Sequence, residues 1–163
     1  AMAVASKVTQ FLDEQGMGYE VVSHQETFSS GEEARAVGVI AGHVAKTLVI
    51  RTRDAEALAV LPASERLDIH KLRDVLGDNH ARLATEEEMG IEFTEFELGA
   101  VPPLGELFGV PVLLDERLER AEEIIFAGGT HRDSVKMSGQ DFLKLTRPNV
   151  VDLVRGGEVE NPY

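Results

Sequence analysis

The chain has 163 residues, of which 43% are hydrophobic and 28% are charged, a composition typical of a soluble globular protein. It contains no cysteine, which excludes disulfides, thiolate catalysis and cysteine-based zinc sites. The formal net charge of −13 argues against a broad basic face for nucleic acid.

The length fits one domain over residues 1–163 with a substantial hydrophobic core. No apolar run is long enough to span a bilayer, and no signal peptide is recognisable. We therefore expect a cytoplasmic protein with no membrane partner. The sequence leaves the oligomeric state open.

The N-terminal segment predicts a helix, a strand and a second, short helix. Apolar residues at helical spacing predict an amphipathic helix over 3–15, and a strand over 19–24 follows it. The next loop carries Phe28. A capping-box spacing behind that residue predicts a short helix over 31–37.

Residues 45–51, Ala-Lys-Thr-Leu-Val-Ile-Arg, form an apolar, β-branched run that predicts a strand, joined by a short polar turn to a second strand over 57–62. Lys46 shares a face with Leu48 and Ile50, because side chains along a strand alternate. Two interpretations of Lys46 stay open. It lies at the mouth of a pocket, or it lays its stem along the core and extends its ammonium into water.

Further along the chain, helix caps mark the elements. Asp68 is expected to cap a helix that ends at Gly77, and Thr85 with Glu88 has the spacing of a capping box. The other expected elements are short strands over 82–84, 112–114, 123–127, 134–137 and 150–154, helices over 115–120 and from Ser138, and a turn over 128–131. This irregular interleaving predicts a single α/β domain, an α+β mixture with a curved mixed sheet flanked by helices.

Residues 98–111 contain three glycines and three prolines, which exclude a regular helix or a central strand. The segment is nevertheless apolar. A stiff, glycine-bearing loop of this kind suits lining a pocket and presenting backbone N–H groups, and it equally suits packing between two elements at the surface.

The motifs of metal and phosphate chemistry are missing. The five histidines include no close pair at a ligand spacing, and no P-loop, dinucleotide fingerprint or nucleophile elbow occurs. We therefore expect no metal and no cofactor. One inward lysine, glycine-bearing turns and a few hydroxyls suit binding an acyl group and stabilising an oxyanion.

Taken in order, several segments resemble the YbaK/ProX family of aminoacyl-tRNA deacylases, which is related to the editing domain of bacterial prolyl-tRNA synthetases. The resemblance covers roughly residues 5–150, and its shared order is more specific than any single motif. The segments that carry it are the 19–24 strand with Thr27-Phe28-Ser29, Ala45-Lys46-Thr47-Leu48-Val49, Leu61-Pro62, Gly99-Ala100-Val101-Pro102-Pro103, Phe126-Ala127-Gly128-Gly129 and Met137-Ser138.

The resemblance implies a curved, barrel-like α/β fold and metal-independent hydrolysis of the ester between a wrongly attached amino acid and tRNA, commonly alanine or cysteine on the proline tRNA. It implies that Lys46 is the key polar residue. It also implies the substrate-binding set, in which the glycine loop presents N–H groups near the ester and the glycine pair closes the pocket. That set is Phe28, Thr47, Gly99, Ala100, Val101, Pro102, Gly128, Gly129 and Ser138.

His131 follows the glycine pair and carries two interpretations, a general base or amine ligand, or an ordinary solvent-facing turn residue. The expected partners are the acceptor end of a mischarged tRNA and, as a candidate, an aminoacyl-tRNA synthetase. Two alternatives to a deacylase of the same fold stay open, a non-catalytic small-molecule or nucleotide-binding module and a protein that docks on a synthetase.

Overall fold

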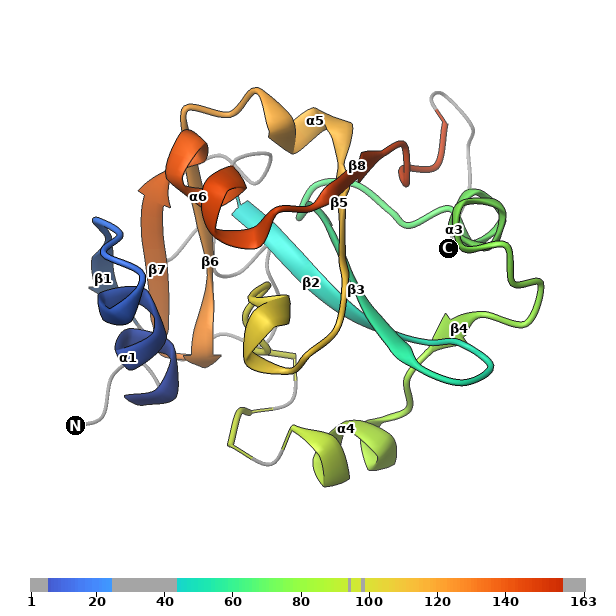
Figure 1. Cartoon of the computed structure of the whole chain (residues 1–163), viewed down its shortest axis with the longest axis horizontal. Coiled ribbons are helices and arrows are strands. Elements are labelled where there is room, and N and C mark those ends of the chain that lie inside the picture. The colour runs from blue at the N-terminus through green and yellow to red at the C-terminus, as the bar shows by residue number, and fades with distance from the viewer. Residues whose placement is uncertain (1–5, 25–43, 94, 98, 157–163) are drawn as a thin grey trace.

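A computed structural model describes residues 6–24, 44–93, 95–97 and 99–156. Eight strands form one sheet in the order β1-β7-β6-β2-β3-β5-β8, and β4 adds to β2 (Figure 1). The strands are β1 (Glu20–Ser23), β2 (Val44–Arg51), β3 (Glu56–Pro62), β4 (Arg82–Leu83), β5 (Val112–Asp115), β6 (Glu123–Thr130), β7 (Asp133–Ser138) and β8 (Asn149–Val151). The helices are α1 (Ser6–Glu14), α3 (Ile69–Leu76), α4 (Glu86–Glu92), α5 (Glu116–Glu119), α6 (Gly139–Thr146) and a 3₁₀ turn, η2 (Gly105–Leu107).

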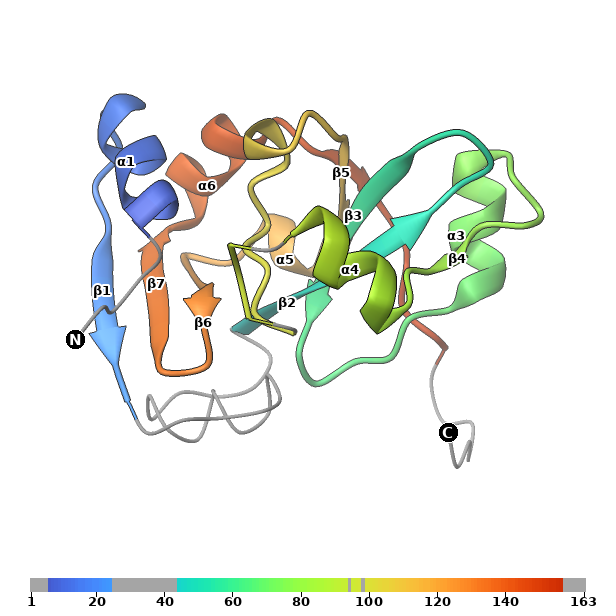
Figure 2. The same ribbon diagram turned by 90° about the horizontal axis from the view of Figure 1, so that it is seen from below.

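The sheet is mixed. β2 runs parallel to β6, as β3 does to β5 and β5 to β8, while the other pairs are antiparallel. In Figure 1, β6 and β7 run at a clear angle to β2 and β3, and α1 with β1 lies at the opposite end of the molecule from α3 with β4, as Figure 2 also shows. The predicted mixed α/β fold is confirmed. No helix within the described ranges is long and apolar enough to cross a membrane.

The predicted caps are confirmed. The Asp68 carboxylate accepts from the backbone N–H of His70 at 2.9 Å, and Gly77 ends α3 with a φ of 64°. Thr85 and Glu88 form a complete capping box at the start of α4. These local signals located both helices because each satisfies backbone groups that a helix end leaves unpaired.

Two expectations were wrong in detail, and a third lies outside the described residues. The glycine pair is not a turn, because β6 continues to Thr130 through a bulge in which Gly129 has a φ of 104°. The bulge adds residues to β6 and moves the turn onto 131–132. The last strand ends at Val151, and Val154 makes only an isolated bridge to Leu67. The helix predicted over 31–37 falls outside the description.

The core forms two clusters, and β2 contributes to both because its side chains alternate. Ala45 and Val49 belong to the larger cluster, whereas Leu48 and Ile50 belong to or pack against the smaller one. β3 is buried along almost its whole length. The central hairpin is therefore held from both sides, which gives the residues of β2 fixed positions.

A buried carboxylate ties the C-terminal segment to the sheet. Asp115 is fully buried, and it accepts from the backbone N–H of Arg117 at 2.9 Å and of Leu153 at 2.8 Å. The Arg117 guanidinium also donates to this carboxylate. Both carboxylate oxygens are thus engaged by donors, and an amide of the same shape cannot accept at both positions.

We expect Asp115→Asn to lower the free energy of unfolding by about 2 kcal/mol, because the amide NH₂ faces a backbone donor in a buried site. Urea unfolding followed by circular dichroism measures this. The control is Asp152→Asn, which weakens ion pairs with Lys71 and Arg117 at a side chain that is 42% exposed, and which should cost under about 1 kcal/mol. Equal losses in the two variants would contradict the role assigned to Asp115.

Candidate active site

Strand β2 has an open edge near its middle. On the side away from β3, it pairs with β6 only at Val44 and Ala45 and with β4 only at Ile50 and Arg51. Figure 1 shows β6 and β4 at the two ends of β2. Residues 46–48 therefore have no strand partner on this side within the part of the chain that the structure describes. The gap exposes a short length of backbone at the centre of the sheet.

Lys46 lies at this gap, on the face that carries Leu48 and Ile50. It is half-buried, and its ammonium donates to the backbone carbonyl of Glu65 at 2.5 Å. Burial lowers its pKa, and the nearby charge of Arg66 lowers the pKa further against a smaller opposing effect of Glu65. The ammonium is thus held by the loop after β3 and is not extended into bulk water.

The charge of Lys46 is not neutralised locally. A carbonyl accepts its hydrogen bond, and no carboxylate among the described residues forms an ion pair with it. Arg66 adds a second cation nearby, and its effect on Lys46 exceeds the opposing effect of the Glu65 carboxylate. Two cations near one carboxylate leave a net positive charge at this point, which favours an anionic ligand.

An apolar cavity of about 140 Å³ opens beside the same edge. Thr47 and Val49 contribute from the face of β2 opposite Lys46, and the glycine loop contributes Gly99 and Val101. The structure therefore brings three predicted site residues together, while Lys46 does not line this cavity. The complete lining is Thr47, Leu48, Val49, Leu83, Ala84, Met89, Gly99 and Val101.

Glu97 fastens the glycine loop to the β6–β7 hairpin. Its backbone N–H donates to the Gly129 carbonyl at 2.9 Å, and its carboxylate accepts from the backbone N–H of His131 at 2.6 Å. A Cβ built on Gly99 would lie 3.4 Å from Cε1 of the His131 ring. Gly99, Gly129 and His131 are therefore neighbours. The sequence carried no signal for Glu97, because its partner lies 34 positions away.

Few backbone donors remain in the glycine loop. Ala100 is buried and its N–H donates to the Glu97 carbonyl at 3.0 Å, while Pro102, also buried, has no N–H. The N–H groups of Gly99 and Val101 have no partner among the described residues, and both residues line the cavity. The loop thus offers two donors where the sequence suggested a longer series.

The other predicted site residues lie apart from this group. Ser138 caps α6, where its hydroxyl accepts from the Asp141 N–H at 3.1 Å, and it pairs with Glu123 at the far end of the hairpin from His131. Gly128 is buried within β6. Phe28 lies outside the described residues.

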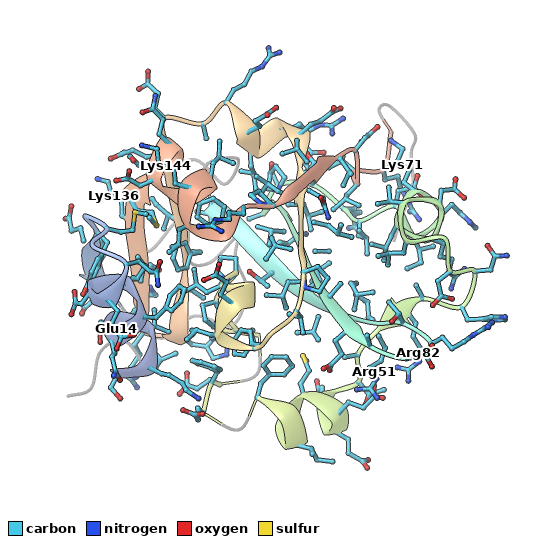
Figure 3. The ribbon with its side chains drawn as sticks, viewed as in Figure 1. Glu14, Arg51, Lys71, Arg82, Lys136 and Lys144 are labelled. Atoms are coloured by element: carbon cyan, nitrogen blue, oxygen red, sulfur yellow. The ribbon has the colours of Figure 1, made fainter. Side chains whose placement is uncertain are left out.

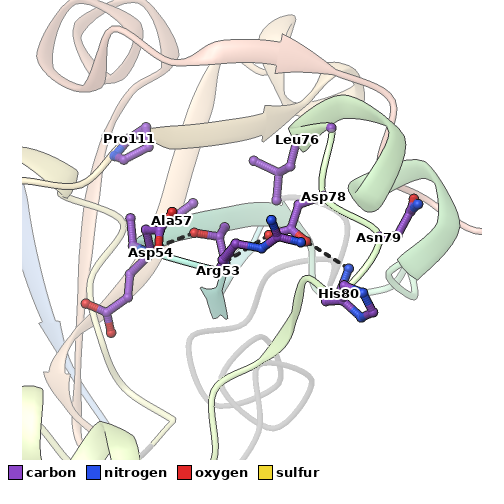
Figure 4. Close-up of a pocket in the computed structure, with 12 residues that line it drawn as sticks. Arg53, Asp54, Ala57, Leu76, Asp78, Asn79, His80 and Pro111 are labelled. Atoms are coloured by element: carbon purple, nitrogen blue, oxygen red, sulfur yellow. Dashed lines mark hydrogen bonds between the residues drawn. The ribbon is translucent and has the colours of Figure 1, made fainter.

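A wider groove of about 560 Å³ lies between the β2–β3 turn and the loop after α3 (Figure 4). Its central carboxylate, Asp78, accepts from the backbone N–H groups of Arg53 and His80. These bonds lower the pKa of Asp78 and hold the two turns together. The polar groups of the groove thus serve the fold, so we do not place the chemistry there.

Two arginines adjoin each other at the β4 end of β2. Arg51 and Arg82 pair across β2 and β4 and lie side by side at the edge of the molecule (Figure 3). Arg82 binds Glu88 through two hydrogen bonds of 2.9 and 3.0 Å and holds the pKa of that carboxylate at about 2. No group of three or more residues able to hold a metal ion occurs in the described ranges.

Comparisons with known proteins show the family of the chain. The profile of the aminoacyl-tRNA editing domain matches residues 24–145. The chain is 28% identical over 154 residues to the multifunctional Ser/Thr-tRNA deacylase ProXp-y of Escherichia coli (strain K12), covering 91% of this chain and 92% of that protein. A crystal structure described as a candidate trans-editing enzyme for prolyl tRNA synthetase superposes with a TM-score of 0.84 at 34% identity, covering 93% and 97% of the two chains. The proline–tRNA ligase of Thermosipho melanesiensis is 24% identical over 119 residues, which are 73% of this chain and 21% of that enzyme.

The fold and the profile match define a hydrolase that acts on aminoacyl-tRNA esters. The chain belongs to the aminoacyl-tRNA editing domain family. The resemblance to YbaK/ProX proteins and to the prolyl-tRNA synthetase editing domain is confirmed.

Gly99→Ala should reduce ester hydrolysis by up to about 100-fold, because left-handed backbone strain at a φ of 81° shifts a loop that must be positioned within an ångström, and the added Cβ comes into van der Waals contact with the His131 ring. The matched control is Gly109→Ala. Its φ of 69° resembles the 81° of Gly99, and a Cβ there meets nothing within 4 Å.

Both substitutions should lower the free energy of unfolding by about 1 kcal/mol through left-handed backbone strain. Rates of deacylation and thermal melts, measured on the same preparations, separate the two effects. Equal loss of activity in both variants would remove the glycine loop from the site.

Proposed function

We propose that this protein hydrolyses, in trans, the ester that joins a small, wrongly attached amino acid to the 3′ end of a tRNA. The observation that carries the proposal is the open edge of β2, where Gly99 and Val101, whose N–H groups have no partner among the described residues, line an apolar cavity. Gly99 adjoins the His131 ring, and Lys46 lies on the opposite face of the strand, outside the cavity. The family match supports the same reaction class.

The chemistry follows from these groups. Water adds to the ester carbonyl carbon, the bond to the ribose oxygen breaks, and that oxygen takes a proton, which releases the amino acid and the tRNA. The N–H groups of Gly99 and Val101 stabilise the negative charge that develops on the carbonyl oxygen. Lys46 holds a phosphate or a ribose-side oxygen of the terminal adenosine and so fixes the ester in place.

His131 is the nearest titratable side chain to Gly99 that the structure describes. In this proposal it takes a proton from the attacking water, or it binds the α-amine of the substrate. The hairpin that carries it is held by Asp133, a buried carboxylate that accepts from the hydroxyls of Ser23 and Thr130.

The amino acids proposed as substrates are small. Alanine and cysteine on the proline tRNA remain the candidates from the family resemblance, and serine and threonine join them because the Escherichia coli relative is named for those two. A synthetase rejects a smaller amino acid poorly by binding alone, which makes a second hydrolytic site useful. With a net charge of −13, contact is confined to the acceptor end, or a synthetase partner delivers the tRNA.

Lys46→Ala should lower kcat/KM by roughly 100-fold or more while the protein stays folded, since each lost 1.4 kcal/mol of transition-state binding slows the reaction about tenfold. The assay is a panel of tRNAs charged with alanine, cysteine, serine and threonine. The matched control is Lys136→Ala on β7, which removes a surface lysine paired with Glu123 and should leave the rate unchanged. Wild-type turnover by a folded Lys46→Ala protein would refute the assignment. If the wild type hydrolyses none of the charged tRNAs in the panel, the alternative of a non-catalytic binding module would replace the proposed function.

The pH dependence of the enzymatic rate tests the role of Lys46 in a second way. A purely structural role of Lys46 would not change this pH dependence. Burial lowers the pKa of Lys46, so its positive charge is lost as pH rises through a value below that of an ordinary lysine. The enzymatic rate, corrected for spontaneous ester hydrolysis, should fall over the same interval. Lys46→Arg keeps its charge and should lack this fall, whatever its absolute rate.

A further inference from the structure

The cavity beside β2 has an apolar wall and one polar side. Leu83, Ala84, Met89 and Val101 supply apolar side chains, and Thr47, on the open edge of β2, also lines the cavity. An apolar cavity of about 150 Å³ holds a benzene ring, so this one, of about 140 Å³, takes a flat ring system of limited size. Leu83 is 48% exposed, so the cavity opens at the surface.

The register of the β2–β3 hairpin shows where the Thr47 backbone points. The bonds from Thr52 N–H to the Ala55 carbonyl and from Ala63 N–H to the Val44 carbonyl mark the hydrogen-bonded set of pairs. Thr47, opposite Val60, belongs to the alternate set.

The backbone N–H and C=O of Thr47 therefore point away from β3, as does the carbonyl of Val49, which accepts from Ala84. β6 and β4 do not reach Thr47, and no hydrogen-bond partner for its backbone lies among the described residues. An apolar slot is thus bordered by one adjacent donor and acceptor.

We propose that this cavity binds the adenine base of the substrate's 3′-terminal adenosine. The Thr47 carbonyl accepts from the adenine N6 amine, and the Thr47 N–H donates to N1. The ring packs against Met89 and Leu83. This proposal rests on the proposed function and assigns the part of the substrate that every tRNA shares.

The surroundings place the rest of the nucleotide consistently. At one end of the cavity, Gly99 adjoins His131, where the acylated ribose must lie for hydrolysis. At the other end, Leu83 is preceded by Arg82, which lies beside Arg51 (Figure 3). Both guanidinium groups are already paired with carboxylates, Arg51 with Glu56 and Glu88 and Arg82 with Glu88. The 5′ phosphate, which is bonded to the ribose, therefore stays at the Gly99 end of the cavity in this proposal.

The competing occupant of the cavity is the side chain of the amino acid. For alanine the polar border argues against it, because a methyl side chain would leave the Thr47 N–H and C=O desolvated without partners. A serine or threonine hydroxyl can bond to these groups, so the test includes a threonyl substrate. A base satisfies both groups and also covers the apolar wall. Because every tRNA ends in the same adenine, backbone groups that bind this base can hold substrates that carry different amino acids.

The test compares tRNAs that end in adenosine or inosine, each charged with alanine or threonine. Inosine keeps the bicyclic ring and reverses both hydrogen-bonding positions. The wild type should lose about tenfold or more in kcat/KM on inosine ends, by the same factor for both amino acids.

Ala84→Leu, which fills the cavity, should slow alanyl and threonyl substrates by one common factor and reduce the inosine effect to within about threefold, since coupled changes at one contact are not additive. Ala55→Leu, the same change at an exposed turn position, should leave both ratios as in the wild type. Ratios between substrates on one preparation do not depend on the folded fraction.

Three results would overturn the proposal. Equal wild-type rates on adenosine and inosine ends would exclude base reading by Thr47 while leaving the deacylase function intact. An Ala84→Leu protein that rejects threonine more than alanine, with the inosine effect unchanged, would give the cavity to the amino-acid side chain. No hydrolysis of any substrate by the wild type would remove the proposed function and the adenine site with it.

Discussion

The site depends on one interruption in the sheet. Among the residues that the structure describes, β2 has no strand neighbour on one side from Lys46 to Leu48, because β6 and β4 reach only its two ends. A neighbouring strand paired along the whole of β2 would occupy the backbone hydrogen-bonding groups of Thr47. It would also close the gap between the face that carries Lys46 and the opposite face. The interruption instead leaves a strand edge unpaired inside a well-packed core. Backbone N–H and C=O groups there can form hydrogen bonds with a ligand in a site largely shielded from water.

The local charge at this edge is positive, whereas the net charge of the molecule is negative. The protein carries a net charge of −13, yet Lys46 donates to a neutral carbonyl and has a cationic neighbour, Arg66, whose effect exceeds that of Glu65. Burial, and after it the charge of Arg66, lowers the pKa of Lys46. A local cation in an anionic protein fits recognition of one end of a polyanion, with little attraction for the remainder of the tRNA.

Local signals predicted much of the fold from the sequence. The hairpin of β2 and β3, the caps Asp68 and Thr85 and the irregular path of the glycine loop follow from residue types at short spacing. Whether that loop lines a pocket or packs at the surface was left open by the sequence. The bulge that keeps Gly129 inside β6 and the tether from Glu97 to His131 were not predictable, because they arise from long-range register and contacts. Met89 and Ala84 gave no signal for the same reason, since apolar residues on a helix or strand read as core wherever they lie.

The most direct test of the account uses an amide-linked alanyl-adenosine, which cannot be hydrolysed as the ester is, and follows backbone amide shifts of the protein by NMR. Binding at the open edge of β2 predicts that the amides of Thr47, Gly99, Val101 and His131 shift together and saturate at one ligand concentration. Shifts confined to the groove around Asp78, or none near Thr47 and Gly99 at saturation, would contradict the site assigned to this protein.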